Sequence, residues 1–116
     1  MKSIKNLATI VLTPAILGSC SGITNSENQA PRVIMSASTY ESIYSGNAIF
    51  FDGSDSYDYD GEIVEYEWDF GDGYGATGMK ANHRYDAVGN FIACLEITDN
   101  EGAASRACTG VNVLPK

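Results

Sequence analysis

The chain has 116 residues, which is enough for one domain with a hydrophobic core of its own. Its 7 basic and 15 acidic residues give a formal net charge of −8, a balance that disfavours nucleic acid and anionic lipid surfaces as partners. The same balance is compatible with divalent cations and with basic partners. Beyond residue 20 the basic residues are scattered and form no basic patch: Arg32, Lys80, Arg84, Arg106 and Lys116.

Residues 1–19 are predicted to be a signal peptide. Two lysines near the start precede an apolar stretch, Leu7–Leu17, that is too short to cross a hydrocarbon core of ~30 Å as a stable helix. The stretch ends in Leu-Gly-Ser-Cys, with the cysteine at position 20. Removal of this segment would take away two lysines and no acids, leaving 5 basic and 15 acidic residues and a net charge of −10.

The Leu-Gly-Ser-Cys ending resembles the bacterial lipobox. The resemblance implies a lipoprotein signal peptide and a membrane anchor on Cys20, with residues 20–30 as the lipidated cysteine and a flexible polar tether. Ser21 behind the cysteine resembles the pattern that is sorted to the outer membrane of a Gram-negative cell envelope. The alternative is an ordinary signal peptide cleaved near Ser19 or Ser21, which would leave the protein secreted or periplasmic.

Residues 31–114 are expected to form one all-β domain, because short strand-like runs alternate with turn signals and no helix of useful length is present. About seven strands at this spacing are typical of an immunoglobulin-like β-sandwich. The predicted strands are Arg32–Ala37, Ala48–Asp52, Ile63–Phe70, Ala76–Met79, Asn82–Tyr85, Phe91–Thr98 and Ala103–Val113.

The third of these runs shows the clearest alternation of apolar and polar residues, as expected of a half-buried strand. Its two predicted faces are Val64, Tyr66, Trp68 and Phe70 toward the core, and Ile63, Glu65, Glu67 and Asp69 toward solvent. Three carboxylates on one face could resemble the acid pair of a glycosidase. The solvated face of a strand is the simpler interpretation.

Cys94 and Cys108 are predicted to form a disulfide across the last hairpin, whose turn is Asp99–Gly102. A register in which Thr98 opposes Ala104 also places the two cysteines directly opposite each other. Opposed Cβ atoms lie ~4.5–5.5 Å apart, slightly wide of the ~3.5–4.5 Å of a disulfide, so a modest adjustment is needed. The alternative is a redox or metal pair, but no histidine or third cysteine stands nearby in the sequence, and an oxidising compartment favours a bridge.

Between Asn28 and Val113, a series of short motifs follows in a fixed order: Phe51-Asp52-Gly53-Ser54, Asp58-Tyr59-Asp60-Gly61, Trp68-Asp69-Phe70-Gly71-Asp72-Gly73, His83-Arg84-Tyr85, Gly89-Asn90-Phe91 and Leu95-Glu96-Ile97-Thr98-Asp99. Together they resemble the signature of the PKD domain, a small immunoglobulin-like β-sandwich of extracellular proteins. The resemblance implies a module that binds or spaces rather than catalyses.

A loop rich in Asp, Ser and Gly follows the second predicted strand and is the best candidate for a ligand site. Asp58 and Asp60 are two residues apart, so their side chains can converge on one cation, and Ca²⁺ takes six to eight oxygen ligands. The resemblance to the calcium-binding PKD domains of bacterial collagenases adds Asp99, Asn28 and Gln29, the last where the family typically has serine. The alternative is a solvated loop with Asx turns, because many PKD domains bind no metal.

Tyr57, Tyr59 and Tyr74 are candidate binding residues, since exposed loop tyrosines stack on sugar rings and protein surfaces. The alternative is a scattered amphipathic surface. His83 is the only histidine and is interpreted as structural. Asp69 and Asp72 are expected to accept backbone N–H bonds in the turn that they flank.

The sequence therefore predicts a non-catalytic, lipid-anchored module that binds an envelope protein or an extracellular polysaccharide, with Ca²⁺ as a stabilising ion. The alternative is a purely structural spacer or assembly component of an envelope complex. A hydrolase is not expected, because the chain has no nucleophile elbow and no phosphate loop, and a sandwich this small offers little cleft for substrate.

Overall fold

The computed structural model describes residues 27–39 and 41–116. The predicted signal peptide, Cys20 and most of the predicted tether lie outside the described residues. The described part is built from strands, and it holds no helix of the length and apolarity needed to cross a membrane. Its strands are β1 (Ser36–Ala37), β2 (Ser42–Tyr44), β3 (Ala48–Asp52), β4 (Ile63–Asp69), β5 (Gly75–Thr77), β6 (Lys80–Arg84), β7 (Gly89–Asp99) and β8 (Ala104–Leu114).

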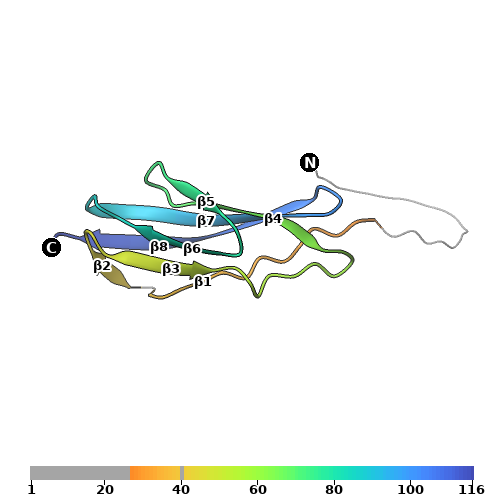
Figure 1. Ribbon diagram of the computed structural model, residues 1–116, viewed down its shortest axis with the longest axis horizontal. Helices are drawn as coiled ribbons and strands as arrows, with labels where there is room; N and C mark the ends of the chain where they lie inside the picture. Colours follow the sequence, from red (N-terminus) through yellow and green to blue (C-terminus); the bar gives the residue numbers. More distant parts are fainter. Residues whose placement is uncertain (1–26, 40) are drawn as a thin grey trace, which may run out of the picture.

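The strands form two sheets that face each other (Figure 1). One sheet has the order β1-β3-β6, and the other has the order β2-β8-β7-β4-β5. Neighbouring strands are antiparallel except β2 and β8, which pair in parallel. This arrangement confirms the predicted all-β, immunoglobulin-like sandwich.

The core lies between the two sheets and takes every second side chain of the central strands, as the pleat requires. Aromatic rings dominate it: the ring of Phe51 lies 5.5 Å from that of Trp68 and 5.6 Å from that of Phe70, centroid to centroid. The other fully enclosed apolar residues come mainly from β3, β7 and β8: Ile49, Ala93, Leu95, Ile97, Val111 and Val113. Burying a large apolar side chain contributes about 1.5–3 kcal/mol.

The predicted disulfide is present and closes the β7–β8 hairpin. Thr98 opposes Ala104, as expected, and Cys94 opposes Cys108 with their Cα atoms 4.0 Å apart. The bridge lies on the face of the sheet that points away from the core, since the neighbouring residues Ala93 and Leu95 point inward.

The first predicted strand, Arg32–Ala37, is mostly wrong, because only its last two residues form β1. Arg32 instead makes an isolated bridge to Tyr57. The Ser56 side chain makes both hydrogen bonds to the backbone of Ile34. The N–H of Ile34 donates to Ser56 Oγ at 2.9 Å, and the Ser56 hydroxyl donates to the Ile34 carbonyl at 3.1 Å. A side chain therefore takes the place of a neighbouring strand.

The predicted facing of β4 holds for its second half and fails at its start. Tyr66 and Trp68 point toward the core, but Val64 is 64% exposed and Ile63 packs partly against the core. The register with β7 shifts between Ile63 and Glu65, so one extra residue is inserted there. Such a bulge reverses the facing of the residues on one side of it.

Two further differences concern short strands. β2 was not predicted, because three residues are too few to show a period, although Ile43 is buried within it. β5 and β6 end earlier than expected, at Thr77 and Arg84. Gly78, with a φ of 111°, makes the turn between them, a conformation that favours glycine.

Candidate functional site

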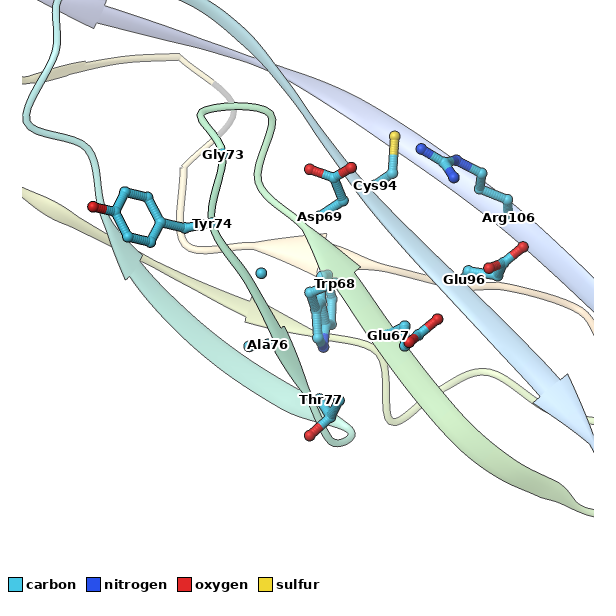
Figure 2. A pocket seen from close by; sticks show the side chains of 11 residues that line it. Glu67, Trp68, Asp69, Gly73, Tyr74, Ala76, Thr77, Cys94, Glu96 and Arg106 are labelled. Atoms are coloured by element: carbon cyan, nitrogen blue, oxygen red, sulfur yellow. The ribbon is translucent and has the colours of Figure 1, made fainter.

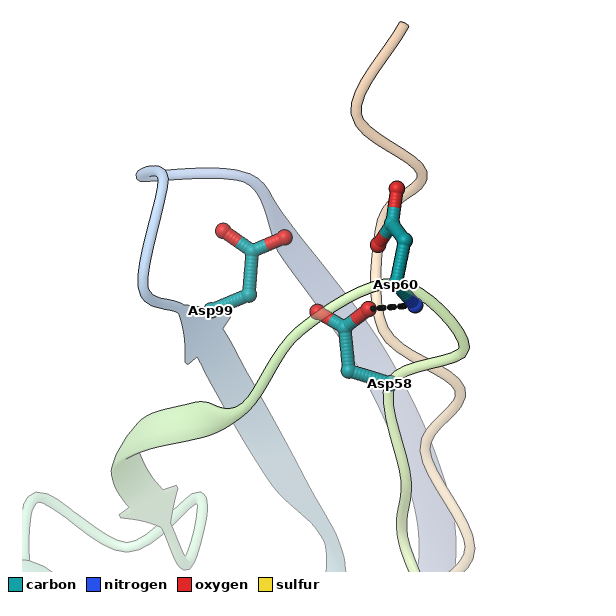
Figure 3. A group of neighbouring side chains, drawn as sticks. All are labelled: Asp58, Asp60 and Asp99. Carbon is teal, nitrogen blue, oxygen red and sulfur yellow. Dashed lines mark hydrogen bonds between the residues drawn. The ribbon is translucent and has the colours of Figure 1, made fainter. Parts of the chain in front are cut away.

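Three carboxylates meet at one end of the sandwich (Figure 3). Asp58 and Asp60 come from the loop between β3 and β4, and Asp99 is the last residue of β7. One oxygen from each lies within 4.8 Å of the others. The two segments are about 40 residues apart in the chain, so this group exists only because the sandwich brings both loops to the same end.

Local hydrogen bonds orient these side chains. Asp58 Oδ1 accepts the backbone N–H of Asp60 at 3.0 Å, an Asx turn. Asp99 Oδ1 accepts the N–H groups of Glu101 at 2.9 Å and Ala103 at 2.8 Å, which holds the carboxylate inside its own hairpin turn. The second oxygen of Asp58 accepts no hydrogen bond within the described residues.

The N-terminal residues of the described part join the same group. Asn28 Nδ2 donates to Asp99 Oδ2 at 2.8 Å, and the backbone N–H of Gln29 donates to Asp60 Oδ2 at 2.7 Å. All five residues that were predicted to hold a cation are thus brought together. The contact of Gln29 is made by a backbone donor, however, and a donor cannot serve as a cation ligand.

Two oxygens in this group have no hydrogen-bond partner within the described residues. They are Asn28 Oδ1 and Asp58 Oδ2, and both are buried. A buried polar atom left without a partner costs about 1–3 kcal/mol. Both atoms are acceptors beside two further carboxylates, so the partner that suits them all is a cation with a preference for oxygen.

The carboxyl groups differ in acidity for identifiable reasons. Side-chain contact with the Asp60 carboxyl group raises the pKa of Asp58, and burial adds to the shift, while the backbone N–H of Asp60 opposes it. The N–H of Gln29 and then the contact with Asp58 hold the pKa of Asp60 below its ordinary value. Burial raises the pKa of Asp99, but hydrogen bonds from Asn28, Ala103 and Glu101 outweigh it and the net shift is downward. Without a cation, Asp58 is therefore the member that retains a proton most readily.

Tyr57 and Tyr59 alternate with these carboxylates along the loop. Their rings meet edge to face with centroids 5.0 Å apart, and their hydroxyl oxygens are 3.2 Å apart. Tyr59 is 75% exposed and Tyr57 is 37% exposed. The pair forms a small aromatic surface beside the carboxylate group.

Tyr74, the third predicted binding residue, does not join that surface. It lies in the turn between β4 and β5, whereas the acidic loop precedes the start of β4. A seven-residue strand is roughly 23 Å long, so the two tyrosine regions are well separated. The predicted tyrosines thus form two surfaces rather than one.

The turn that holds Tyr74 confirms the structural roles predicted for its neighbours. Asp69 accepts the N–H of Gly71 at 2.9 Å, and Asp72 accepts the N–H of Tyr74 at 3.3 Å. The other Asp72 oxygen lies 2.7 Å from Nε2 of His83, whose ring stacks on Phe70 with centroids 4.3 Å apart. His83 is fully engaged in this packing.

A hollow of about 610 Å³, which no sequence pattern predicted, lies on the outer face of the larger sheet, beside this turn (Figure 2). Its side chains include Thr77 from β5, Glu67 from β4, Glu96 from β7 and Arg106 from β8. These four residues are directly opposed from strand to strand, so they form one row across the sheet. The sequence placed Glu67 on a solvated face, and only the strand order brings the other three beside it.

Two facing sheets with one cross-sheet aromatic core and a loop cluster at one end define the class of the protein, an immunoglobulin-like β-sandwich module. Within that class the family is shown by comparison. Residues 28–113 match the family model described as PKD domain, and the chain belongs to this family.

Collagenases are among the relatives. Collagenase ColA of Clostridium perfringens is 37% identical over 87 residues, which is 75% of this chain and 8% of the collagenase. The microbial collagenase of Vibrio alginolyticus is 36% identical over 80 residues, 69% of this chain and 10% of that enzyme. The chain thus spans a tenth or less of the length of these relatives, and the match covers only their PKD part.

Solved structures agree with the fold. The PKD1 domain of Vibrio anguillarum Epp matches with a TM-score of 0.66 and 31% identity over 78% of this chain and 100% of that domain. A structure from a study of carbohydrate-binding modules of the β-sandwich superfamily matches with a TM-score of 0.73 and 36% identity, over 78% of this chain and 36% of that one. PKD domains are typically non-catalytic accessory domains, and both similarities are consistent with a non-catalytic binding module.

Proposed function

We propose that this protein is a non-catalytic, lipid-anchored PKD module that binds a protein or a polysaccharide at the bacterial cell envelope and is stabilised by Ca²⁺. The observation that carries the proposal is the pair of buried, unpartnered oxygens, Asn28 Oδ1 and Asp58 Oδ2, inside a group of three carboxylates. Oxygen atoms of this kind and charge are the ligands that Ca²⁺ prefers.

The ion would be held by Asp58, Asp60, Asp99 and the side-chain oxygen of Asn28. It would neutralise carboxylates that otherwise repel one another, and it would tie three separate segments together: the N-terminal segment, the acidic loop and the β7–β8 turn. Its proposed role is structural, because it would join these three segments at one end of the sandwich.

The loop that binds the ion also carries Tyr57 and Tyr59. Because these residues alternate with Asp58 and Asp60, an ion that orders the loop also orders the two rings. Ordered tyrosines lose little conformational entropy on contact with a partner, which favours their use in binding. The similarity to a structure from work on carbohydrate-binding modules supports a polysaccharide, and the collagenase relatives support a protein.

The anchor is proposed on Cys20, behind the lipobox-like sequence, with the outer membrane as its destination. A secreted or periplasmic protein is the alternative. The net charge of −10 after removal of residues 1–19 supports a partner other than nucleic acid. Mass spectrometry of Cys20 from a bacterial host tests the anchor directly, and an unmodified thiol would contradict it.

Thermal unfolding in EDTA and in millimolar Ca²⁺ tests the ion. At 100 times its Kd, one bound ion adds about 2.7 kcal/mol to the free energy of unfolding, a rise of several degrees in Tm for a domain of this size. The rise should be lost in Asp58→Asn/Asp60→Asn and kept in Asp55→Asn/Glu65→Gln, which removes the same charge from exposed residues elsewhere. An equal rise in both variants would contradict the site.

A structural spacer without a ligand remains the second candidate, supported by the small share of each collagenase that this module represents. Binding screens in Ca²⁺ against envelope proteins and glycans separate the two. Loss of binding in Tyr57→Ala/Tyr59→Ala supports the module's binding role. Absence of any binding at high micromolar concentration supports the spacer.

A further inference from the structure

The outer face of the larger sheet carries a row of hydrogen-bonding side chains. Within residues 27–39 and 41–116, the side chains of Thr77, Glu67, Glu96 and Arg106 make no hydrogen bond and no ion pair. Glu67 and Glu96 are directly opposed, and like charges in that relation destabilise a sheet. Glu96 is also directly opposed to Arg106, a relation that favours opposite charges. The row therefore offers two carboxylates as acceptors and one guanidinium as a donor to a ligand.

The hollow beside this row has a simple structural origin. The next row across the sheet consists of Gly75, Asp69, Cys94 and Cys108. Glycine has no side chain, the two cysteines are short and bonded to each other, and Asp69 turns back to the N–H of Gly71. The volume of about 610 Å³ falls in the ~300–1,000 Å³ range of ligand sites.

Tyr74 forms one rim of the hollow, across from Arg106 (Figure 2). Tyr74 is 69% exposed, and its ring contacts that of His83 with centroids 5.8 Å apart. An exposed, positioned tyrosine offers an apolar ring face together with a polar tip. That combination suits the C–H face and the hydroxyl groups of a sugar ring.

The same face of the sheet carries another hollow. Beyond the disulfide, a second hollow of about 410 Å³ is lined by Ser42, Asn90, Ile92, Gly110 and Asn112, among others. Along β7 the outward residues run Asn90, Ile92, Cys94 and Glu96, so six residues and roughly 20 Å of strand separate the far ends. A polymer can occupy both hollows, whereas a single sugar cannot.

The chemistry of the row selects the class of polymer. Carboxylates accept hydrogen bonds and Arg106 donates them, and a neutral sugar hydroxyl can do both. An anionic polymer is opposed by Glu67, Asp69 and Glu96. A cationic polymer is attracted by these carboxylates and repelled by Arg106 beside Glu96, whereas a neutral polymer meets no repulsion. A protein partner fits poorly, because the centres of protein interfaces are depleted of charged residues.

We propose that the outer face of the β5–β4–β7–β8 sheet, centred on Glu67, Glu96 and Arg106 with Tyr74 at its rim, binds a segment of a neutral polysaccharide. This inference rests on the proposed binding function, names its ligand, and adds a second surface apart from the one that carries Tyr57 and Tyr59. It does not depend on the ion, because the row is separated from the carboxylate group by part of β4 and β7.

Affinity electrophoresis of the whole chain in gels that contain a soluble neutral glucan, xylan or galactomannan tests the proposal, with alginate and chitosan as charged probes. We expect at least one neutral polymer to retard the protein, in EDTA as in Ca²⁺ and in about 0.5 M salt, where contacts between exposed charges are screened. Alginate should cause no retardation. Retardation by chitosan alone, or by no neutral polymer, would overturn the proposal.

Variants locate the surface. Glu96→Ala and Tyr74→Ala should each weaken binding about tenfold or more, because each variant removes one contact with the polymer. Glu65→Ala, which removes an exposed carboxylate from the same strand outside the hollow, should leave binding unchanged. If Tyr57→Ala/Tyr59→Ala abolishes binding while Glu96→Ala and Tyr74→Ala do not, the polymer does not bind on the outer face of the sheet. The proposed binding function would then still hold. If Ca²⁺ does not raise the Tm of the unmodified protein but a neutral polymer still retards it, the calcium site is contradicted and the polysaccharide surface is not.

Discussion

Asn28 and Asp99 are 71 positions apart in the sequence and are joined by a hydrogen bond of 2.8 Å from Nδ2 to Oδ2. The bond connects the N-terminal segment to the β7–β8 turn, next to the carboxylates of the acidic loop. Asp99 is 1% exposed, so its charge depends on these donors for compensation. The end of the sandwich is thus a place where three chain segments are held by the same few polar atoms.

Asn28→Ala should lower the free energy of unfolding by about 1–3 kcal/mol even in EDTA, because it removes a hydrogen bond to a buried charge. Gln29→Ala is the matched control. It keeps the backbone N–H that Asp60 accepts, so its stability should match that of the original chain. Chemical denaturation of the three proteins measures the difference, and equal midpoints for all three would contradict the structural role of Asn28.

Stabilisation by Ca²⁺ should weaken as the pH falls from 7 toward about 4, because protons and the cation compete for the same carboxylates. The lowered pKa values of Asp60 and Asp99 contribute stability that is present above the unfolded-state pKa and is lost as the pH falls through their folded values. The raised pKa of Asp58 has the opposite sign, since its contribution is lost as the pH rises through the folded value. Tm measured against pH, with and without Ca²⁺, checks the trend; a rise in Tm that is the same at every pH would argue against carboxylate ligands.

Gly71→Ala should destabilise the fold by about 3 kcal/mol or more, since it combines an unfavourable φ with a steric clash. Gly71 has a φ of 85°, and an added Cβ would meet the Ile92 carbonyl oxygen and approach its backbone nitrogen to 2.9 Å. Gly73, in the same turn, has a φ of 95° but nothing within 4 Å of an added Cβ. Gly73→Ala should therefore cost only about 1–2 kcal/mol. Thermal unfolding of both variants measures the two losses of stability. Equal losses would show that the close approach to Ile92 has no effect on stability.

Tyr85→Phe should cost about 1–3 kcal/mol, because it leaves a buried carbonyl without a donor. The Tyr85 side chain is fully buried, and its hydroxyl donates to the Phe70 carbonyl at 2.8 Å. Burial also raises the pKa of Tyr85, so the donor stays protonated. Tyr74→Phe removes an exposed hydroxyl and should leave stability unchanged. A Tyr85→Phe midpoint equal to that of Tyr74→Phe would contradict this role.

Local patterns predicted a large part of this fold. The apolar run within Ala48–Asp52 predicted β3 to the residue, and the register of the last hairpin predicted that Cys94 and Cys108 would face each other. Prediction failed where a non-local contact replaced a local one. Ser56 satisfies the backbone of Ile34 in place of a strand, and a bulge against β7 turns Val64 outward.

The acidic loop illustrates the same division at the candidate site. The spacing of Asp58 and Asp60 suggested convergence on one cation, and the resemblance to PKD domains added Asp99 and Asn28. The unpartnered state of Asn28 Oδ1 and Asp58 Oδ2 became visible only with all three segments in place.

By itself the sequence determined the all-β class, the family and the disulfide, because these depend on strand period, turn residues and motif order within short stretches. Only the tertiary structure decided that Glu67 and Thr77 lie in one row with Glu96 and Arg106, and that Tyr74 is separated from Tyr57 and Tyr59. The physical reason is strand order: which strands become neighbours in a sheet is set by packing of the whole core, and no local pattern along one strand records the residues that will lie beside it.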